Sequence, residues 1–317
     1  MAGNVIRHEG VGVAFSGGGF RSYSEVAAIE DMERHDVRIA AAAGTSMGSI
    51  VAALVAGGLP SQRIEELLVD MDDRIVKEGI VSNLRLKAFN VFTEHGIIPT
   101  STMEREARTT LERAGLRTFA DLRMPLAICA CDIMTGRLVV FTNDAQLFEN
   151  EEATWECVAG DLDIAKCVVA SASYPLVIEP TEYLGRTFID GGARMNLPTP
   201  LFDRAAFDGI VGVGMTRDLD PVDSLDPASI ALRTIQMGAN QLELISSHAA
   251  DVYVGLPVSG DNAFQAGTGR QVIAEARAMI AANPPDWSPV RPSAADAVGR
   301  IIADNVSKLL RAAAPSK

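Results

Sequence analysis

The chain has 317 residues, of which 28 are basic and 41 acidic, so its formal net charge is −13. This excess of carboxylates argues against nucleic acid as a partner and disfavours broad adhesion to anionic lipid. Hydrophobic residues make up 48% of the chain, a share that supports a large globular core. The four cysteines lack the spacing of a metal site, so we expect reduced thiols and no bound metal.

The sequence shows no targeting or membrane-spanning segment. Its first ten residues, MAGNVIRHEG, lack the apolar run of a signal peptide. The longest apolar stretches, such as IVAALVAGGL, are too short to span a bilayer. We therefore expect a soluble, cytoplasmic protein.

Short apolar runs alternate with helical patterns through the first two thirds of the chain. We predict strands at 11–15 and 37–44, and helices at 21–34, at 46–58, from Pro60 onward and at 100–115. We predict four further strands in the segments MPLAICACDI, RLVVFTN, RTFID and FDGIVGVGM. Continuous apolar strands interleaved with helices predict a three-layer α/β/α fold, in which helices cover both faces of a mostly parallel central sheet.

The pattern changes after Met215. Helical spacing dominates residues 229–248 and 269–282, and a Pro-rich stretch, 282–293, precedes a last predicted helix at 294–313. No linker divides the chain before that stretch. We expect one domain over residues 8–281, with the Pro-rich segment and C-terminal helix of residues 282–317 packed on it.

The segment GTSMG, residues 44–48, lies between a predicted strand and a predicted helix. A G-x-S-x-G segment in this position forms a sharp turn that lifts the serine hydroxyl above the sheet, at the positive end of the helix. Glycine is needed on both sides because the turn leaves no room for a Cβ atom. Ser46 is therefore a candidate nucleophile supported by Gly44 and Gly48. The alternative is a tight turn that only packs a small-residue helix.

A run of three glycines, residues 17–19, follows the first predicted strand. Such a loop can present backbone N–H groups to an anion. A phosphate-binding loop fits poorly, because the chain has Phe20 and Arg21 where the Walker pattern needs lysine and a hydroxyl residue, and Ser22 where the dinucleotide pattern needs glycine. The loop therefore suits a transient oxyanion better. Arg21 either orients the loop and neutralises charge beside it, or is an ordinary helix-surface arginine.

A serine nucleophile needs a base, and the chain offers two candidates. Of the four histidines only His248 lies late in the chain, where a Ser–Asp–His hydrolase carries its histidine, but it falls at the end of a predicted helix. Asp190 ends a short predicted strand, and Gly191 and Gly192 then turn the chain and present the carboxylate at the strand's end. Because Asp-Gly turns are also common structural features, the residues alone leave the base open.

Taken in this order, the segments SGGGFR, GTSMG and DGG resemble the patatin-like phospholipase family. The likeness runs over about residues 10–215, and includes a strand pair around a D-x-x-T-G turn and the segment ASASYP before the aspartate. The segment LVIEP departs from the glycine and phenylalanine that are more usual there, which affects the expected pocket shape. The resemblance implies that Ser46 is the nucleophile and that Asp190 is its base, in place of a histidine. It also implies that Gly17, Gly18 and Gly19 form the oxyanion loop and that Arg21 is the basic position after that loop.

The activity that the resemblance implies is that of a serine lipid acyl hydrolase. It would cleave carboxylic ester bonds of (lyso)phospholipids or related acyl esters through an acyl-enzyme, with no cofactor and with transient contact with a membrane surface. Residues 8–281 then form the patatin-like catalytic domain. Three alternatives stay open: a Ser–His–Asp esterase or acyltransferase that uses His248, a non-enzymatic scaffold, and a hydrolase that is silent until a partner or signal activates it.

The segment NLRLKAFNVF, residues 83–92, combines apolar and basic side chains in an otherwise acidic protein. Such a segment can form a lid, an acyl channel or an interfacial patch, and an ordinary helix packed on the core is the alternative. Its candidate residues are Leu84, Leu86, Phe89 and Phe92.

Overall fold

The computed structural model describes residues 7–80, 98–148, 154–216, 218–219, 221, 224–259 and 265–291. Its strands are β1 Val11–Phe15, β2 Ile39–Thr45, β3 Leu126–Asp132, β4 Arg137–Thr142, β5 Trp155–Ala159, β6 Thr181–Tyr183, β7 Arg186–Asp190, β8 Gly209–Gly214 and β9 Val252–Gly255. Its helices are α1 Glu25–Arg34, α2 Gly48–Ala56, α3 Ser61–Lys77, α5 Thr100–Arg113, α6 Ala145–Phe148, α7 Ile164–Ala172, α8 Pro227–Ser247 and α9 Gly269–Ala282. Short 3₁₀ turns are η1 Gly19–Ser24, η3 Phe119–Asp121, η4 Gly191–Ala193, η5 Thr199–Leu201 and η6 Ser288–Val290.

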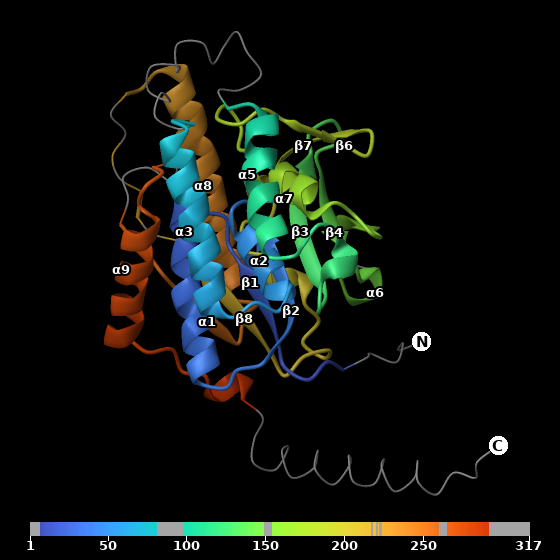
Figure 1. Ribbon diagram of the computed structural model, residues 1–317, viewed down its shortest axis with the longest axis vertical. Coiled ribbons are helices and arrows are strands. Elements are labelled where there is room, and N and C mark those ends of the chain that lie inside the picture. Colours follow the sequence, from blue (N-terminus) through green and yellow to red (C-terminus); the bar gives the residue numbers. More distant parts are fainter. Residues whose placement is uncertain are drawn as a thin grey trace, which may run out of the picture.

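The strands form one sheet with the order β5-β4-β3-β2-β1-β8-β9, while β7 pairs with β3 and β6 pairs with β7 (Figure 1). The central pairs β3–β2, β2–β1, β1–β8 and β8–β9 are all parallel. Helices flank this mostly parallel sheet, which confirms the predicted α/β class. The β3–β4 pair is antiparallel around the predicted D-x-x-T-G turn.

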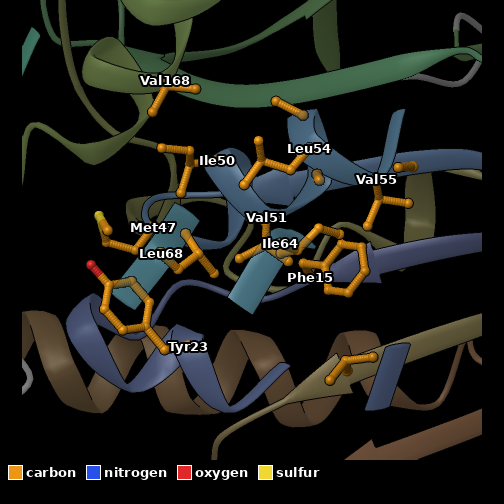
Figure 2. Close-up of a cluster of buried hydrophobic side chains, with 14 of the residues drawn as sticks. Phe15, Tyr23, Met47, Ile50, Val51, Leu54, Val55, Ile64, Leu68 and Val168 are labelled. Atoms are coloured by element: carbon orange, nitrogen blue, oxygen red, sulfur yellow. The ribbon is translucent and has the colours of Figure 1, made fainter. Parts of the chain in front are cut away.

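Alternating side chains of the strands enter two separate apolar cores, one on each face of the sheet. On the larger face, Phe15 of β1 packs with the aliphatic side chains of α2, which lie between it and Val168 of α7 (Figure 2). On the other face, small residues such as Ala14 and Cys129 meet the segment 195–207. The sheet is thus buried on both faces, as expected of parallel strands with continuous apolar runs.

Most predicted elements form close to the expected bounds, with two informative differences. The helix expected from residue 21 begins with the 3₁₀ turn η1, and regular α-helix starts only at Glu25. The helix expected from residue 46 begins at Gly48, so Ser46 stays in the turn before it. Strands β5, β6 and β9 were not predicted from the sequence. The helix expected at 294–313 lies outside the described residues.

The start of the Pro-rich segment packs on the body of the protein. Trp287 is 3% exposed, and its indole Nε1 donates a hydrogen bond of 2.8 Å to Asp31 Oδ2 of α1. Val290 is also buried and lies against Gly209 of β8. Within the described ranges, no helix is both long enough and apolar enough to cross a membrane.

Candidate active site

Ser46 lies in a strained turn between β2 and α2. Its φ of 54° is in the left-handed region, which non-glycine residues rarely occupy. A Cβ atom on Gly44 would lie 2.5 Å from the carbonyl oxygen of Gly48, and one on Gly48 would lie 2.4 Å from the carbonyl oxygen of Ser16. The two glycines therefore allow the turn to close, for the reason that the spacing suggested.

Hydrogen bonds hold the backbone of this turn in place. The Ser46 N–H donates to Ser171 Oγ at 2.8 Å, and Ser171 Oγ donates to the carbonyl oxygen of Cys129 in β3 at 2.5 Å. The carbonyl oxygen of Ser46 accepts from the N–H and the hydroxyl of Ser49. Ser171 was not among the predicted residues, although it lies in the ASASYP segment of the family resemblance.

Asp190 lies beside Ser46 because β7 pairs with the end of β3 on the same edge as β2, the strand that leads to Ser46. Ser46 Oγ donates a hydrogen bond of 2.6 Å to Asp190 Oδ2, and the N–H of Gly192 donates one of 2.7 Å to Oδ1. Asp190 is 3% exposed, and this burial raises the pKa of its carboxyl to about 6, although the two hydrogen bonds oppose the shift. The carboxylate is thus placed to accept a proton from Ser46 near neutral pH.

The backbone around Asp190 explains the two glycines that follow it. Strand β7 ends at Asp190, as expected, and runs antiparallel to β3, with Asp190 opposite Ala130. A Cβ atom on Gly191 would lie 2.2 Å from the carbonyl oxygen of Cys129, and one on Gly192 would lie 2.8 Å from Asn196 Oδ1. Glycine therefore lets this turn pass close to β3 and to Asn196.

The glycine run lies beside Ser46, but its three N–H groups are not equivalent. The Gly17 N–H donates to the carbonyl oxygen of Asn196 at 3.1 Å, so this group is already occupied, contrary to the expectation that all three N–H groups face an oxyanion. The N–H groups of Gly18 and Gly19 have no acceptor among the described residues. A Cβ atom on Gly17 would lie 3.0 Å from Ser46 Cβ, which places the loop directly against the serine.

Arg21 contacts the loop rather than lying only on the helix surface. Its Nε donates a long hydrogen bond of 3.4 Å to the carbonyl oxygen of Gly18. Because a trans peptide points its C=O and the next N–H in opposite directions, this contact helps to orient the N–H of Gly19. The arrangement favours the loop-orienting interpretation of Arg21.

A small apolar pocket is lined in part by Met47, the residue that follows the serine. Its lining comes from α2, α3, α5, α7 and the segment that follows α7, and consists of Met47, Ile50, Met71, Met103, Glu106, Ala107, Val168, Val169, Ala172 and Ile178. Figure 2 shows Met47, Ile50 and Val168 on this side of α2. The one charged member, Glu106, is paired with Arg74 and Arg105. Sequence patterns did not single out this pocket.

The other predicted candidates lie elsewhere. His248 is exposed at the end of α8, and its Nδ1 lies 2.7 Å from the carbonyl oxygen of Leu244. The segment with Leu84, Leu86, Phe89 and Phe92 lies outside the described residues. Among the described part of the chain, no cluster of three or more His, Cys, Asp or Glu side chains could hold a metal ion.

The model of the family described as patatin-like phospholipase matches residues 13–203, and the chain belongs to this family. Membership implies lipid acyl hydrolase activity. The chain is 30% identical over 207 residues to the uncharacterized protein YqhO of Bacillus subtilis (strain 168), covering 63% of this chain and 69% of YqhO. It is 26% identical over 198 residues to the uncharacterized protein R571 of Acanthamoeba polyphaga mimivirus, covering 60% of this chain and 61% of R571.

Two solved structures match this chain over most of its length. VipD from Legionella pneumophila matches with a TM-score of 0.41 and 12% identity, over 86% of this chain and 66% of VipD. The type III effector ExoU of Pseudomonas aeruginosa matches with a TM-score of 0.40 and 15% identity, over 88% of this chain and 53% of ExoU. The chain thus spans less than two thirds of R571, VipD and ExoU.

Proposed function

We propose that the protein is a serine lipid acyl hydrolase that cleaves carboxylic ester bonds with Ser46 as nucleophile and Asp190 as base. The observation that carries this proposal is the buried hydrogen bond of 2.6 Å from Ser46 Oγ to Asp190 Oδ2. A nucleophile within hydrogen-bond reach of a base whose pKa is about 6 is the arrangement that general-base activation requires at neutral pH.

In the first half of the reaction, Ser46 Oγ attacks the ester carbonyl carbon while its proton passes to Asp190. The carbonyl oxygen becomes an oxyanion, and the N–H groups of Gly18 and Gly19 stabilise it. When the intermediate collapses, the bond from carbon to the alcohol oxygen breaks, and the alcohol leaves with the proton from Asp190. Ser46 then carries the acyl group.

In the second half, water releases the acyl group. Asp190 accepts a proton from the water, whose oxygen attacks the acyl carbon and forms a second oxyanion in the same loop. Collapse breaks the bond between carbon and Ser46 Oγ, and the proton returns to the serine. The hydrogen bond from the Gly192 N–H keeps the carboxylate oriented through both halves.

The apolar pocket at Met47 supports an acyl chain as the group that the site accepts. Its lining is aliphatic apart from Glu106, whose carboxylate is held by two arginines. Contact of an acyl group with this apolar lining is favourable by about 0.8 kcal/mol for each methylene that leaves water. We therefore propose (lyso)phospholipids or related long-chain acyl esters as substrates.

A fluorophosphonate probe tests the proposal, because it forms a covalent bond with an activated serine. We expect intact-mass analysis to find one adduct on the wild type, located at Ser46 by peptide mapping, and none on Ser46→Ala. Asp190→Asn should label slowly. Asp132→Asn is the matched control: Asp132 is a buried aspartate, 4% exposed, that accepts from the N–H of Met134 and not from the serine. It should label at the wild-type rate.

His248→Ala separates this proposal from a Ser–His–Asp enzyme. The dyad predicts full labelling and full hydrolysis of p-nitrophenyl butyrate by this variant, because the imidazole is exposed and bonded within its own helix. Folded wild-type protein that takes up no probe, or a Ser46→Ala variant that still hydrolyses the ester, would contradict the proposed function. Loss of hydrolysis in His248→Ala would favour the histidine-dependent alternative.

A further inference from the structure

A buried carboxylate from helix α8 lies behind the glycine run. Glu243 is 2% exposed. Its Oε1 accepts hydrogen bonds from the backbone N–H groups of Met215 and Thr216, at 2.8 and 2.7 Å, and from the hydroxyl of Tyr253 at 3.0 Å. Its Oε2 accepts one of 2.9 Å from Asn196 Nδ2. Four donors therefore converge on this one side chain.

The end of strand β8 is shaped to admit the carboxylate. Gly214 is the last residue of β8, and a Cβ atom there would lie 2.5 Å from Glu243 Oε1 and 2.6 Å from the hydroxyl of Tyr253. Any other residue at position 214 would push the carboxylate away from its donors. The close approach of Glu243 to the backbone after β8 thus depends on a glycine.

Asn196 connects Glu243 to the first peptide of the glycine run. Asn196 Nδ2 donates both to Glu243 Oε2 and to the carbonyl oxygen of Gly17, at 2.9 and 3.1 Å. The backbone oxygen of Asn196 accepts from the Gly17 N–H, so Gly17 is held from both sides. Because the peptide is planar and trans, fixing the Gly17 carbonyl also fixes the direction of the Gly18 N–H.

Met215 forms a second connection, to the middle glycine. Its N–H is bound by Glu243, and its side chain lies so close to Gly18 that a Cβ atom there would be 2.4 Å from Met215 Cε. Glu243 thereby fixes the residue on which Gly18 rests. Glu243 is thus connected to Gly17 through Asn196 and to Gly18 through Met215.

We propose that Glu243 is a positioning residue, which holds the Gly18 and Gly19 N–H groups where the oxyanion forms by fixing Asn196 and Met215. This proposal rests on the proposed function, since it concerns the same reaction. The oxyanion exists only in the transition state and the intermediate. Displacing its donors therefore lowers kcat and leaves substrate binding largely unchanged.

The primary test is Glu243→Gln, assayed with p-nitrophenyl butyrate. Glutamine keeps the size of the side chain, but its NH₂ group must face either Asn196 Nδ2 or the N–H groups of Met215 and Thr216, so that donors meet in both orientations. We expect kcat to fall about 10- to 100-fold, with KM within about twofold of wild type, because losing one oxyanion donor outright costs about 100- to 1,000-fold. The rate of fluorophosphonate labelling should fall in parallel with kcat.

Glu25→Gln is the matched control. Glu25 is a fully buried glutamate at the start of α1, and burial, together with the nearby charge of Glu243, raises the pKa of its carboxyl well above the usual value. The hydrogen bonds of Asn196 Nδ2 and of the Met215 N–H go to Glu243 and not to Glu25, so kcat should stay within about twofold of wild type. An equal loss of kcat in both variants would overturn the proposal, because any change to a buried carboxyl would then suffice.

A double-mutant cycle with Asn196→Ala keeps the test decisive if one variant folds poorly. If Glu243 acts partly through Asn196, its replacement must cost less in the Asn196→Ala background than in the wild type. Full additivity, an unchanged kcat in folded Glu243→Gln, or a rise in KM alone would overturn the proposal. If the wild type labels normally and the variants behave like it, only the positioning role of Glu243 is refuted. If the wild type takes up no probe, the proposed function itself is refuted.

Discussion

Replacing Asp190 with asparagine is expected to stabilise the fold while it removes the proposed base. Burial raises the pKa of the Asp190 carboxyl from its usual 3.8 to about 6. Above pH 6 the folded protein therefore holds an ionised carboxylate that the unfolded chain would solvate better. Asparagine keeps the shape of the side chain and cannot ionise, so the variant avoids this cost.

The size of the effect follows from the two pKa values. The difference between 3.8 and about 6 corresponds to about 3 kcal/mol of unfolding free energy at pH 8. Between the two pKa values the gain shrinks, to about half that size near pH 5. Well below 3.8 the carboxyl is protonated in both states, so wild type and variant should differ little.

Urea unfolding of both proteins between about pH 4 and pH 8 measures this difference directly. Asp226→Asn is a control of opposite sign: hydrogen bonds from Ser229 and its neighbours hold the pKa of Asp226 below its usual 3.8. That variant should be less stable than wild type at neutral pH and approach it as the pH falls. The Asp190→Asn protein should meanwhile hydrolyse p-nitrophenyl butyrate at least about 100-fold more slowly.

Two results would refute this reasoning about Asp190. One is an unfolding free energy whose difference from wild type stays constant from about pH 4 to pH 8. The other is an Asp190→Asn protein that is less stable than wild type at pH 8, which would mean that the hydrogen bonds from Ser46 and Gly192 outweigh the burial of the charge.

Four further outcomes are expected. The kcat/KM of the wild type on a soluble ester should rise with pH through about 6 and then level off, because the base must be ionised; a flat profile contradicts this. Gly48→Ala should lose activity and about 1–3 kcal/mol of unfolding free energy in urea, because its Cβ atom would lie 2.4 Å from a backbone oxygen. As a control, Gly238→Ala should gain about 0.5–1 kcal/mol, because a Cβ atom at position 238 would have no heavy atom within 4 Å. Val168→Phe should narrow the apolar pocket and reduce kcat/KM on long-chain esters about tenfold relative to the butyrate ester. An equal effect on both esters would refute the proposal that this pocket contacts the acyl chain. Trp287→Phe leaves a buried carboxylate without its indole donor and should cost about 1–3 kcal/mol in thermal unfolding, with no change in activity.

Much of the fold could be predicted because its signals are local. The apolar run at 11–15 forms β1, and the helical pattern at 269–282 forms α9 with the same bounds. Continuous apolar runs separated by helices require a sheet covered on both faces, and this sheet is observed. The short strands β6 and β9 were missed, because three or four residues carry too little periodicity to distinguish a strand from a loop.

The sequence by itself determined the residue types that the site needs. Glycines flank Ser46 and follow Asp190 because the backbone there passes too close to other backbone for a Cβ atom. That steric requirement is local, so it is visible in GTSMG and DGG, and the resemblance to the patatin-like family rests on it.

Only the tertiary structure decided which groups meet. It places Asp190 beside Ser46 through an antiparallel strand, and it shows that Asn196 occupies the N–H of Gly17. Glu243 has no local signal at all: it is one glutamate in a helix of ordinary pattern, yet it lies behind a loop more than 200 residues earlier in the chain. Such contacts depend on how the sheet orders its strands, and no short stretch of sequence carries that order.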